Sequence, residues 1–244
     1  MDKAPYIFKA RSISRSRLGR KKPCDLTTAA KHNCRELKAE TGHFGRIDSK
    51  LSHLNIYVVG PTSAIEIAAR AEEDALVPDR TGKPPRYDHT QAIELIFSLP
   101  LTVGEWHKQF FIDCVDWVAK AFLGHRIYSA VIHYDEGPPH CHVLISPIRY
   151  GVRVGSVVID RASLAKLKDK FWCEVASPKG LSMPAPRLKG ARKREAVERV
   201  VQYLSNESRP CVESKLWPFM EAAINHDPGM ALHLIVTNAA GVST

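Results

Sequence analysis

The sequence lacks an apolar run long enough to cross a membrane and lacks paired cysteines. No stretch approaches the roughly 18 uninterrupted apolar residues of a membrane span, and the N-terminus, MDKAPYIFKARSISRSR, has no apolar signal core. The six cysteines are scattered without a CxxC pair, so we expect reduced thiols rather than a disulfide framework. Internal repeats and low-complexity tracts are also absent from the sequence. These absences predict a soluble, cytoplasmic globular protein.

The sequence has fewer acidic than basic residues. The chain of 244 residues has 35 Lys and Arg against 26 Asp and Glu, a formal net charge of +9. Such a balance raises the local concentration of anions and favours nucleic acid or phosphorylated partners, although many basic proteins bind no DNA.

The basic residues are concentrated in two stretches, one before residue 23 and one between 187 and 194. A solvated, flexible arm is the alternative interpretation of each stretch, but two of them flanking a candidate catalytic centre favour phosphate contacts. The residues that we predict to contact DNA are Arg11, Arg15, Arg17, Lys21, Lys22, Arg192 and Lys193.

Hydrophobic periodicity predicts strands that alternate with helices. Strands are expected at 6–13, 52–59, 91–100, 126–136 and 141–148, with a short further strand at SVVID (156–160). Helices are expected from an N-cap at Asp25 to a break at Thr41 and Gly42, and over 62–76, 104–122, 161–176 and 188–204. We therefore predict an α+β fold with an open, mainly antiparallel five-stranded sheet and helices on one face, which leaves the other face free to hold a site.

The stretch HYDEGPPHCH contains three histidines and two acids within ten residues. His140 and His142 project to the same side if both lie in a strand, and His133 can stand beside them across the hairpin. Three imidazoles on one sheet face suit Mn²⁺, Fe²⁺, Co²⁺ or Zn²⁺ and leave positions open for water or a phosphate oxygen. Glu136 would fix an imidazole tautomer or complete the coordination directly. The predicted metal ligands are His133, His140 and His142.

These residues resemble a known family. HxDExxPHxH, followed by an apolar run and Pro147, is similar to the metal motif of the MobV (Mob/Pre) plasmid mobilisation relaxases. AAKHNCRE (29–36) and IDSKLSHLNI (47–56) resemble the HNxR and HLN elements of that family, and LAKLKDKFWCEV leading to KGL (164–181) is a weaker echo. The similarity runs from about residue 5 to 200, in the order and rough spacing of the family.

The resemblance implies a relaxase-type fold of the two-histidine-motif endonucleases and a metal-dependent transesterase. Such an enzyme nicks one DNA strand at a plasmid transfer origin and stays attached to the 5′ phosphate, for conjugative mobilisation and plasmid recombination. It implies a divalent metal cofactor, for which we expect Mn²⁺ or Mg²⁺. The implied partners are origin DNA, as single strand and hairpin, and a conjugation coupling protein, with no membrane contact of its own.

The resemblance points to His32, in HNxR, as the nucleophile that forms a phosphoramidate with DNA. A functionless histidine on a helix surface is the alternative from the residues alone. Arg35 would share a helix face with His32 and clamp the phosphate, or else form a salt bridge with a local acid. Glu136 completes the predicted catalytic set. Tyr57 is expected on the strand side opposite to Ile56, which argues against a tyrosine nucleophile there, and Tyr6 is the remaining fallback.

The expected organisation is a relaxase catalytic domain over 1–204 and a C-terminal extension of unknown role over 205–244. The extension matches nothing in the family, so it is a short accessory unit or the remnant of a truncated reading frame, and the oligomeric state stays open. Two other functions compete. One is a non-catalytic DNA-binding protein, or truncated regulator, that retains the fold. The other is an unrelated metallohydrolase or oxygenase, which would leave the two basic stretches unexplained.

Overall fold

The computed structural model describes residues 4–14, 25–36, 47–100, 106–184, 188–207, 217–226 and 228. The chain divides into two compact units, residues 1–184 and 185–244. This division precedes the boundary expected at 204. The second unit contains α6 (Gly190–Glu207) and α8 (Trp217–His226), and the first contains the sheet and its flanking helices. Among the residues described, no helix has the length and apolar character that crossing a membrane requires.

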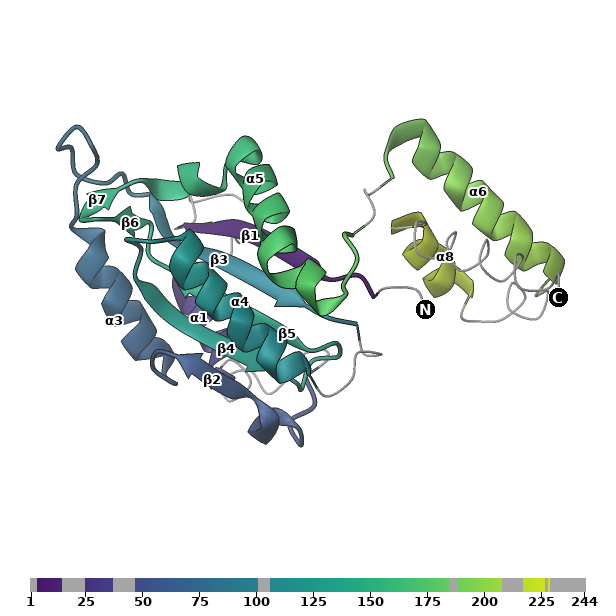
Figure 1. Cartoon of the computed structure of the whole chain (residues 1–244), viewed down its shortest axis with the longest axis horizontal. Helices are drawn as coiled ribbons and strands as arrows, with labels where there is room; N and C mark the ends of the chain where they lie inside the picture. Colours follow the sequence, from purple (N-terminus) through teal and green to yellow (C-terminus); the bar gives the residue numbers. More distant parts are fainter. Residues whose placement is uncertain are drawn as a thin grey trace. The chain divides into compact units, whose positions relative to one another are not determined.

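A five-stranded antiparallel sheet forms the centre of the first unit (Figure 1). Its strands are β1 (Ile7–Ser14), β2 (Ile56–Val59), β3 (Thr90–Ser98), β4 (Ile127–His133) and β5 (His140–Ile145). They lie in the order β1-β3-β5-β4-β2, so β5 is the central strand and pairs with β3 and β4. A two-stranded ribbon, β6 (Ile148–Arg149) and β7 (Val152–Arg153), follows. The predicted α+β class with five antiparallel strands is confirmed.

Two helices cover the first face of the sheet, α4 (His107–Ala121) and α5 (Arg161–Phe171), the latter continuing as a π-helical turn, Trp172–Ala176. Strand alternation sends Leu95 and Phe97 of β3 to this side, where they meet the apolar stripe of α4. Phe97 stacks on Phe8 at a centroid distance of 4.8 Å and contacts Trp117 and Phe171. This aromatic cluster is the main core of the unit.

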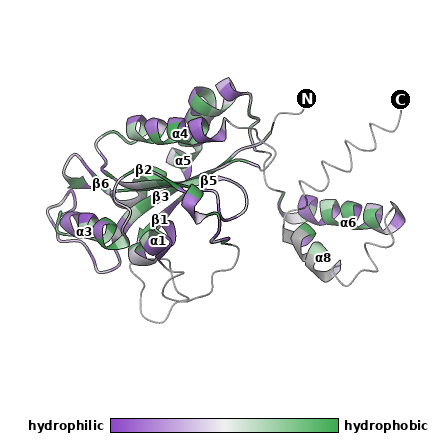
Figure 2. Ribbon diagram, turned by 90° about the horizontal axis from the view of Figure 1, so that it is seen from below, coloured by the Kyte–Doolittle hydropathy of each residue, from purple (hydrophilic) through white to green (hydrophobic). Residues whose placement is uncertain are grey.

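The second face carries α1 (Leu26–Asn33) and α3 (Ala64–Ala75), and it holds a smaller cluster that includes Ala30, Ile67 and Leu144. Figure 2 shows α4 on one side of the strands and α1 and α3 on the other. The expectation of helices on one face is therefore corrected: α1 and α3 each present an apolar stripe that has to be buried against the sheet. They cover only part of this face, and the rest holds the polar residues described below.

Three local predictions were wrong. The helix begins after the N-cap Asp25, whose side chain accepts a hydrogen bond from Thr28 N at 2.8 Å, but it ends at Asn33 instead of continuing to Thr41. Arg35 has a φ of 61°, a left-handed conformation that an α-helix cannot contain. The other two corrections are that SVVID lies in a 3₁₀ segment (Gly155–Ile159) and that 52–54 form a 3₁₀ turn before β2. Short apolar runs do not distinguish a strand from a tight helical turn.

Phe97→Ala should lower the free energy of unfolding by about 3–5 kcal/mol, because the truncation leaves a cavity among three aromatic rings. Urea denaturation followed by circular dichroism measures the change. Ile65→Ala, at a side chain that is 78% exposed, is the control and should change the free energy by about 0.5 kcal/mol or less. A similarly small effect of Phe97→Ala would contradict the assignment of the core.

Candidate metal centre

The β4–β5 hairpin brings the three predicted ligands together on the second face of the sheet. His133 ends β4 and pairs directly with His140, which begins β5, and His142 follows two residues later on the same side. The ring centroids of these histidines are 5.0–5.3 Å apart. His133 is fully buried, His142 is 6% exposed, and the His140 side chain is 14% exposed. Three imidazoles thus converge at a site that is largely shielded from solvent.

Each imidazole is oriented by one fixed acceptor oxygen. His140 Nδ1 lies 2.8 Å from the carbonyl oxygen of Pro138, and His142 Nδ1 lies 2.7 Å from Glu94 Oε1. His133 Nε2 lies 3.1 Å from the carbonyl oxygen of Asn33 in α1. These oxygens only accept, so each contacting nitrogen carries the proton and the opposite nitrogen keeps a lone pair. On His133 that nitrogen, Nδ1, is buried without a hydrogen-bond partner among the described residues.

The potential ligand atoms form two overlapping groups, each within 4.8 Å. One consists of His32, His133 and His142, and the other of His133, Glu136 and His140. The three predicted ligands are thus divided between two groups that share His133. Imidazole nitrogens with one carboxylate oxygen are a donor set for first-row divalent cations. The residues present therefore fit a divalent metal.

Burial lowers the pKa of three imidazoles of this cluster, those of His133, His32 and His140. It lowers the pKa of His133 to about 2, and the neighbouring His142 and Arg35 act in the same direction. Burial and His142 lower the pKa of His32 to about 4, and burial also lowers the pKa of His140. A neutral imidazole is the form that can bind a metal or attack phosphorus.

His32 lies in the last turn of α1 and faces the hairpin. Its ring centroid is 5.6 Å from that of His133 and 5.5 Å from that of His142. Its Nε2 atom is 3.4 Å from Glu136 Oε2, and its side chain is 26% exposed. The structure therefore brings His32 and Glu136, both predicted from the sequence as catalytic, next to the three predicted ligands.

Asp135 joins α1 to the hairpin. Both of its carboxylate oxygens accept from the guanidinium of Arg35, with Nε to Oδ2 at 3.0 Å, and Oδ2 also accepts from Ser52 Oγ at 2.6 Å and Asn55 Nδ2 at 2.9 Å. Burial alone would raise the pKa of Asp135, but these hydrogen bonds hold it well below its usual range. Arg35 in turn donates from Nη1 to the carbonyl oxygen of His32 at 3.1 Å. The carboxylate thereby fixes the end of α1.

Arg35 is accordingly placed in ion pairs with acids of the motif. Its side chain is 10% exposed, and Nη2 lies 3.4 Å from Glu136 Oε2. Because α1 ends at Asn33, the expected sharing of a helix face by His32 and Arg35 was wrong. Of the two roles that the sequence left open for Arg35, this geometry is that of the salt bridge with a local acid.

Glu94 was missed as a site residue. It lies on β3, is 1% exposed, and contacts both His142 and the Nε atom of Arg11. Burial would raise its pKa, but the hydrogen bond and charge of His142, together with Arg11, lower it to about 2. The sequence signal that could have identified it is an acidic residue between apolar residues in a strand, here β3, that lies inside the sheet. Arg11, predicted to bind DNA, has a side chain that is 52% exposed.

The structure does not test the other predicted DNA contacts against this centre, because two lie in the second unit and four lie outside the described residues. Arg192 and Lys193 lie on α6 in the second unit, the first exposed and the second half-buried. The remaining four lie outside the described residues: Arg15, Arg17, Lys21 and Lys22.

The two tyrosines weighed as alternative nucleophiles lie on different faces. Tyr6 is 2% exposed in the aromatic core, away from the histidine face. Tyr57 pairs with Val131 of β4, whereas Ile56 pairs with Ile132, so Tyr57 is on the histidine face and Ile56 on the core face. Tyr57 thus faces the side opposite to Ile56, as predicted, but that side is the histidine face, because the register of β2 with β4 sets which face each residue of β2 occupies.

Comparison with known proteins identifies sequence relatives. A family model described as plasmid recombination enzyme (Mob_Pre) matches residues 11–199. A plasmid recombination enzyme of Bacillus sp. is 31% identical over 162 residues, which cover 64% of this chain and 38% of the relative. A plasmid recombination enzyme type 2 of Staphylococcus aureus strain Mu50 is 31% identical over 147 residues, which cover 57% and 34%. The matched region therefore spans only about a third of these relatives.

Solved structures share the fold. One is a Mn-bound crystal structure, at pH 5.5, of the MobM relaxase domain (MOBV; Mob_Pre) with 22 nucleotides of plasmid pMV158 oriT DNA. It aligns with this chain at a TM-score of 0.60 and 18% sequence identity, and the alignment covers 79% of this chain and 100% of that chain. A second, with a 3′ thiophosphate at pH 6.8, has a TM-score of 0.57 and 19% identity and covers 79% and 99%. The predicted relaxase-type fold is confirmed.

Asp135→Asn should lower the free energy of unfolding by about 3–5 kcal/mol, because it removes the charge of the carboxylate that accepts two hydrogen bonds from the buried guanidinium of Arg35 and leaves only Glu136, at 3.4 Å, as a counter-charge. Urea denaturation at pH 7 measures the loss. Asp88→Asn is the control, since Asp88 pairs with an Arg86 side chain that is 77% exposed, and it should cost about 1 kcal/mol or less. Equal losses in the two variants would contradict the role of Asp135.

Acidification gives a second readout of the same ion pair. The pKa of Asp135 is lower in the folded chain than in the unfolded chain, so its contribution is complete above about pH 5, begins to be lost as the pH falls through the unfolded value near 3.9, and continues to be lost until the pH reaches the folded value. The free energy of unfolding should therefore fall more steeply from pH 5 to pH 3 in the wild type than in Asp135→Asn. Parallel slopes would show that the carboxylate contributes no such stability.

Proposed function

Because this chain belongs to the plasmid recombination enzyme (Mob_Pre) family, we propose that it is a metal-dependent DNA relaxase. In this proposal it nicks one strand at a plasmid transfer origin and becomes covalently attached to the 5′ phosphate. The observation that carries the proposal is the convergence of His133, His140 and His142 with Glu136 and His32 on one sheet face. A protein that only binds DNA has no need of such a cluster.

His133, His140, His142 and Glu136 are the residues that would hold a divalent cation, Mn²⁺ or Mg²⁺. The buried Nδ1 atom of His133, which has no hydrogen-bond partner among the residues with a described position, supports this assignment, as do the Mn-bound relaxase domains of the same fold. When bound, such a cation polarises the scissile phosphate and neutralises the charge that develops on it. Pro138 O, Glu94 and Asn33 O keep the three rings in a single orientation.

His32 is the proposed nucleophile. Its lowered pKa, about 4, keeps the ring neutral at physiological pH, so a nitrogen lone pair is available to attack phosphorus. A bond forms between this nitrogen and phosphorus, and the bond from phosphorus to the 3′ oxygen breaks. The products are a phosphoramidate on the 5′ side and a free 3′ end.

Glu136 and the Asp135–Arg35 pair support this step. Attack through one nitrogen makes the imidazole of His32 positive, and Glu136 Oε2, at 3.4 Å from Nε2, stabilises that charge. Arg35 holds the backbone of His32 through its carbonyl oxygen, while Asp135 holds Arg35. We therefore assign Arg35 as a positioning residue.

The proposed substrate is single-stranded and hairpin DNA at the transfer origin of the replicon that encodes the chain. The net charge of +9 and the oriT DNA bound by the MobM domains support it. A conjugation coupling protein is the proposed second partner.

His140→Ala should weaken Mn²⁺ binding by at least about tenfold to a hundredfold, because it removes a ligand nitrogen from the centre. Isothermal titration of metal-free protein with MnCl₂, with the bound metal counted by mass spectrometry, measures the effect. His53→Ala, at an exposed histidine outside the cluster, is the matched control and should bind like the wild type. Unchanged affinity and stoichiometry in His140→Ala would remove that residue from the ligand set.

His32→Ala should abolish the covalent adduct, with a loss of at least about a thousandfold in the rate of nicking. The assay combines purified protein, supercoiled plasmid carrying its own origin and Mn²⁺, followed by a detergent gel. EDTA should prevent both the nick and the adduct in the wild type. Metal binding should persist in His32→Ala.

An adduct that survives in His32→Ala would exclude His32 as the nucleophile, and its loss in Tyr57→Phe would then identify the tyrosine. Binding of DNA and metal by the wild type without any nick would instead support a DNA-binding protein that retains the fold.

A further inference from the structure

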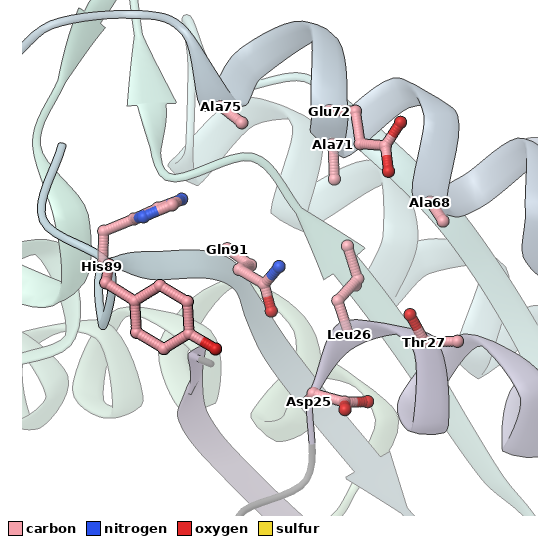
Figure 3. Close-up of a pocket in the computed structure, with 10 residues that line it drawn as sticks. Asp25, Leu26, Thr27, Ala68, Ala71, Glu72, Ala75, His89 and Gln91 are labelled. Carbon is pink, nitrogen blue, oxygen red and sulfur yellow. The ribbon is translucent and has the colours of Figure 1, made fainter. Parts of the chain in front are cut away.

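A cavity opens between α1, α3 and the start of β3. It has a volume of about 310 Å³, at the lower end of the roughly 300–1,000 Å³ of small-molecule sites. Figure 3 shows Gln91 between Asp25 and Leu26, the N-cap and the first residue of α1, and the α3 residues Ala71 and Glu72. The described residues that line it are Asp25, Leu26, Thr27, Ala68, Ala71, Glu72, Ala75, Tyr87, His89 and Gln91. None of these residues belongs to the histidine centre.

The lining combines apolar side chains with hydrogen-bond acceptors and aromatic rings. Leu26, Ala68, Ala71 and Ala75 form the wall, while Tyr87, His89 and Gln91 come from the segment that leads into β3. Such a wall accommodates a flat aromatic group, and a tyrosine or histidine ring provides a stacking surface for a nucleic-acid base.

The charges of the described lining disfavour a phosphate. Asp25 and Glu72 both contribute carboxylates, and none of the lining residues that the structure describes is Lys or Arg. A group that enters must be neutral or cationic and must offer N–H donors to these acceptors. Adenine and cytosine carry an exocyclic amino group, whereas thymine offers a carbonyl oxygen in its place.

Gln91 adds an acceptor that the described residues leave unsatisfied. Its Oε1 atom is buried and has no hydrogen-bond partner within the described part of the chain. A buried acceptor of this kind is unfavourable while it remains unpaired. An amino group in the cavity would pair with it.

The cavity and the histidine centre occupy the same sheet face, and two measures agree on their separation. Asp25 precedes His32 by seven residues of α1, about 10 Å at a rise of ~1.5 Å per residue. Gln91 precedes Glu94, the partner of His142, by three residues of β3, again about 10 Å at ~3.3 Å per residue. A stacked DNA strand covers this distance in about three nucleotides at ~3.4 Å each.

We propose that this cavity holds one unpaired base of the DNA strand, about three nucleotides from the scissile phosphate, and that it selects adenine or cytosine over thymine. The inference rests on the proposed relaxase function for its substrate. Glu72 and Gln91 accept from the amino group, Tyr87 supplies the stacking ring, and the phosphates stay outside. Arg86 is 77% exposed and adjacent to Tyr87, and its solvent-exposed pair with Asp88 exchanges readily for a phosphate.

The test measures binding of 5′-labelled 12-mers of oligo(dA), oligo(dC) and oligo(dT) to the full chain by fluorescence anisotropy, in EDTA at one fixed salt concentration. The wild type should bind oligo(dA) and oligo(dC) about tenfold more tightly than oligo(dT). Ala68→Phe fills the cavity and should remove this difference while leaving the oligo(dT) affinity unchanged. Ala69→Phe places the same side chain at an exposed position of α3 and should keep the difference.

Variants at two surface positions, Glu72 and Tyr87, test the same base preference if Ala68→Phe disturbs folding. Glu72→Gln removes a negative charge, so it should raise the affinity for all three strands by simple electrostatics, yet reduce the preference for oligo(dA) and oligo(dC). Tyr87→Ala should weaken oligo(dA) binding about tenfold and Tyr87→Phe should restore it, since the ring is 67% exposed and only its stacking surface is needed.

Equal binding of the three strands by the wild type, or an unchanged preference in Ala68→Phe and Tyr87→Ala, would overturn the base pocket. Neither result would affect the relaxase proposal, which is judged by the metal-dependent adduct. A selective pocket in a chain that forms no adduct would support the pocket and overturn the nicking activity.

Discussion

The buried ion pair between Asp135 and Arg35 is the interaction on which the site depends. It connects two segments a hundred residues apart, the end of α1 and the turn after β4, and it recruits Ser52 and Asn55 from the segment before β2. A buried pair of this kind repays its desolvation only when its remaining hydrogen-bonding groups are satisfied, and here the carboxylate accepts from three side chains. The pair thereby holds His32 against the histidine hairpin.

Side chains alternate along the central strand β5, so one face of the sheet carries the apolar core and the other carries the candidate site. Cys141, Val143 and Ile145 of β5 enter the aromatic core, whereas His140 and His142 face the other side. The large apolar core lies under α4 and α5, so the second face can carry buried polar groups that contribute little to packing. This division explains how a domain of this size tolerates a cluster of desolvated imidazoles and carboxylates.

Within the site, the two carboxylates nearest the rings have different environments. Glu94 is buried and paired with Arg11 and His142, which fixes it as an anion that orients a ring. Glu136 is 27% exposed and lies near His32, His140 and Arg35 without a fixed hydrogen bond from the described residues. The first is suited to a structural role, and the second is free to adjust to a metal or a substrate.

The sequence by itself determined those features of the protein that depend on local residue patterns. Alternation and turn residues located the five strands, and the spacing of His140 and His142 placed both on one face because side chains alternate along a strand. The resemblance of the motifs around His32 and His133 to those of the family also indicated which distant segments act together. The tertiary structure alone decided the partners of Arg35 and Glu94, the face of Tyr57 and the early end of α1. Each of these depends on the register of a neighbouring strand or on a partner such as Asp135, and a single sequence does not encode such long-range pairings as a local signal.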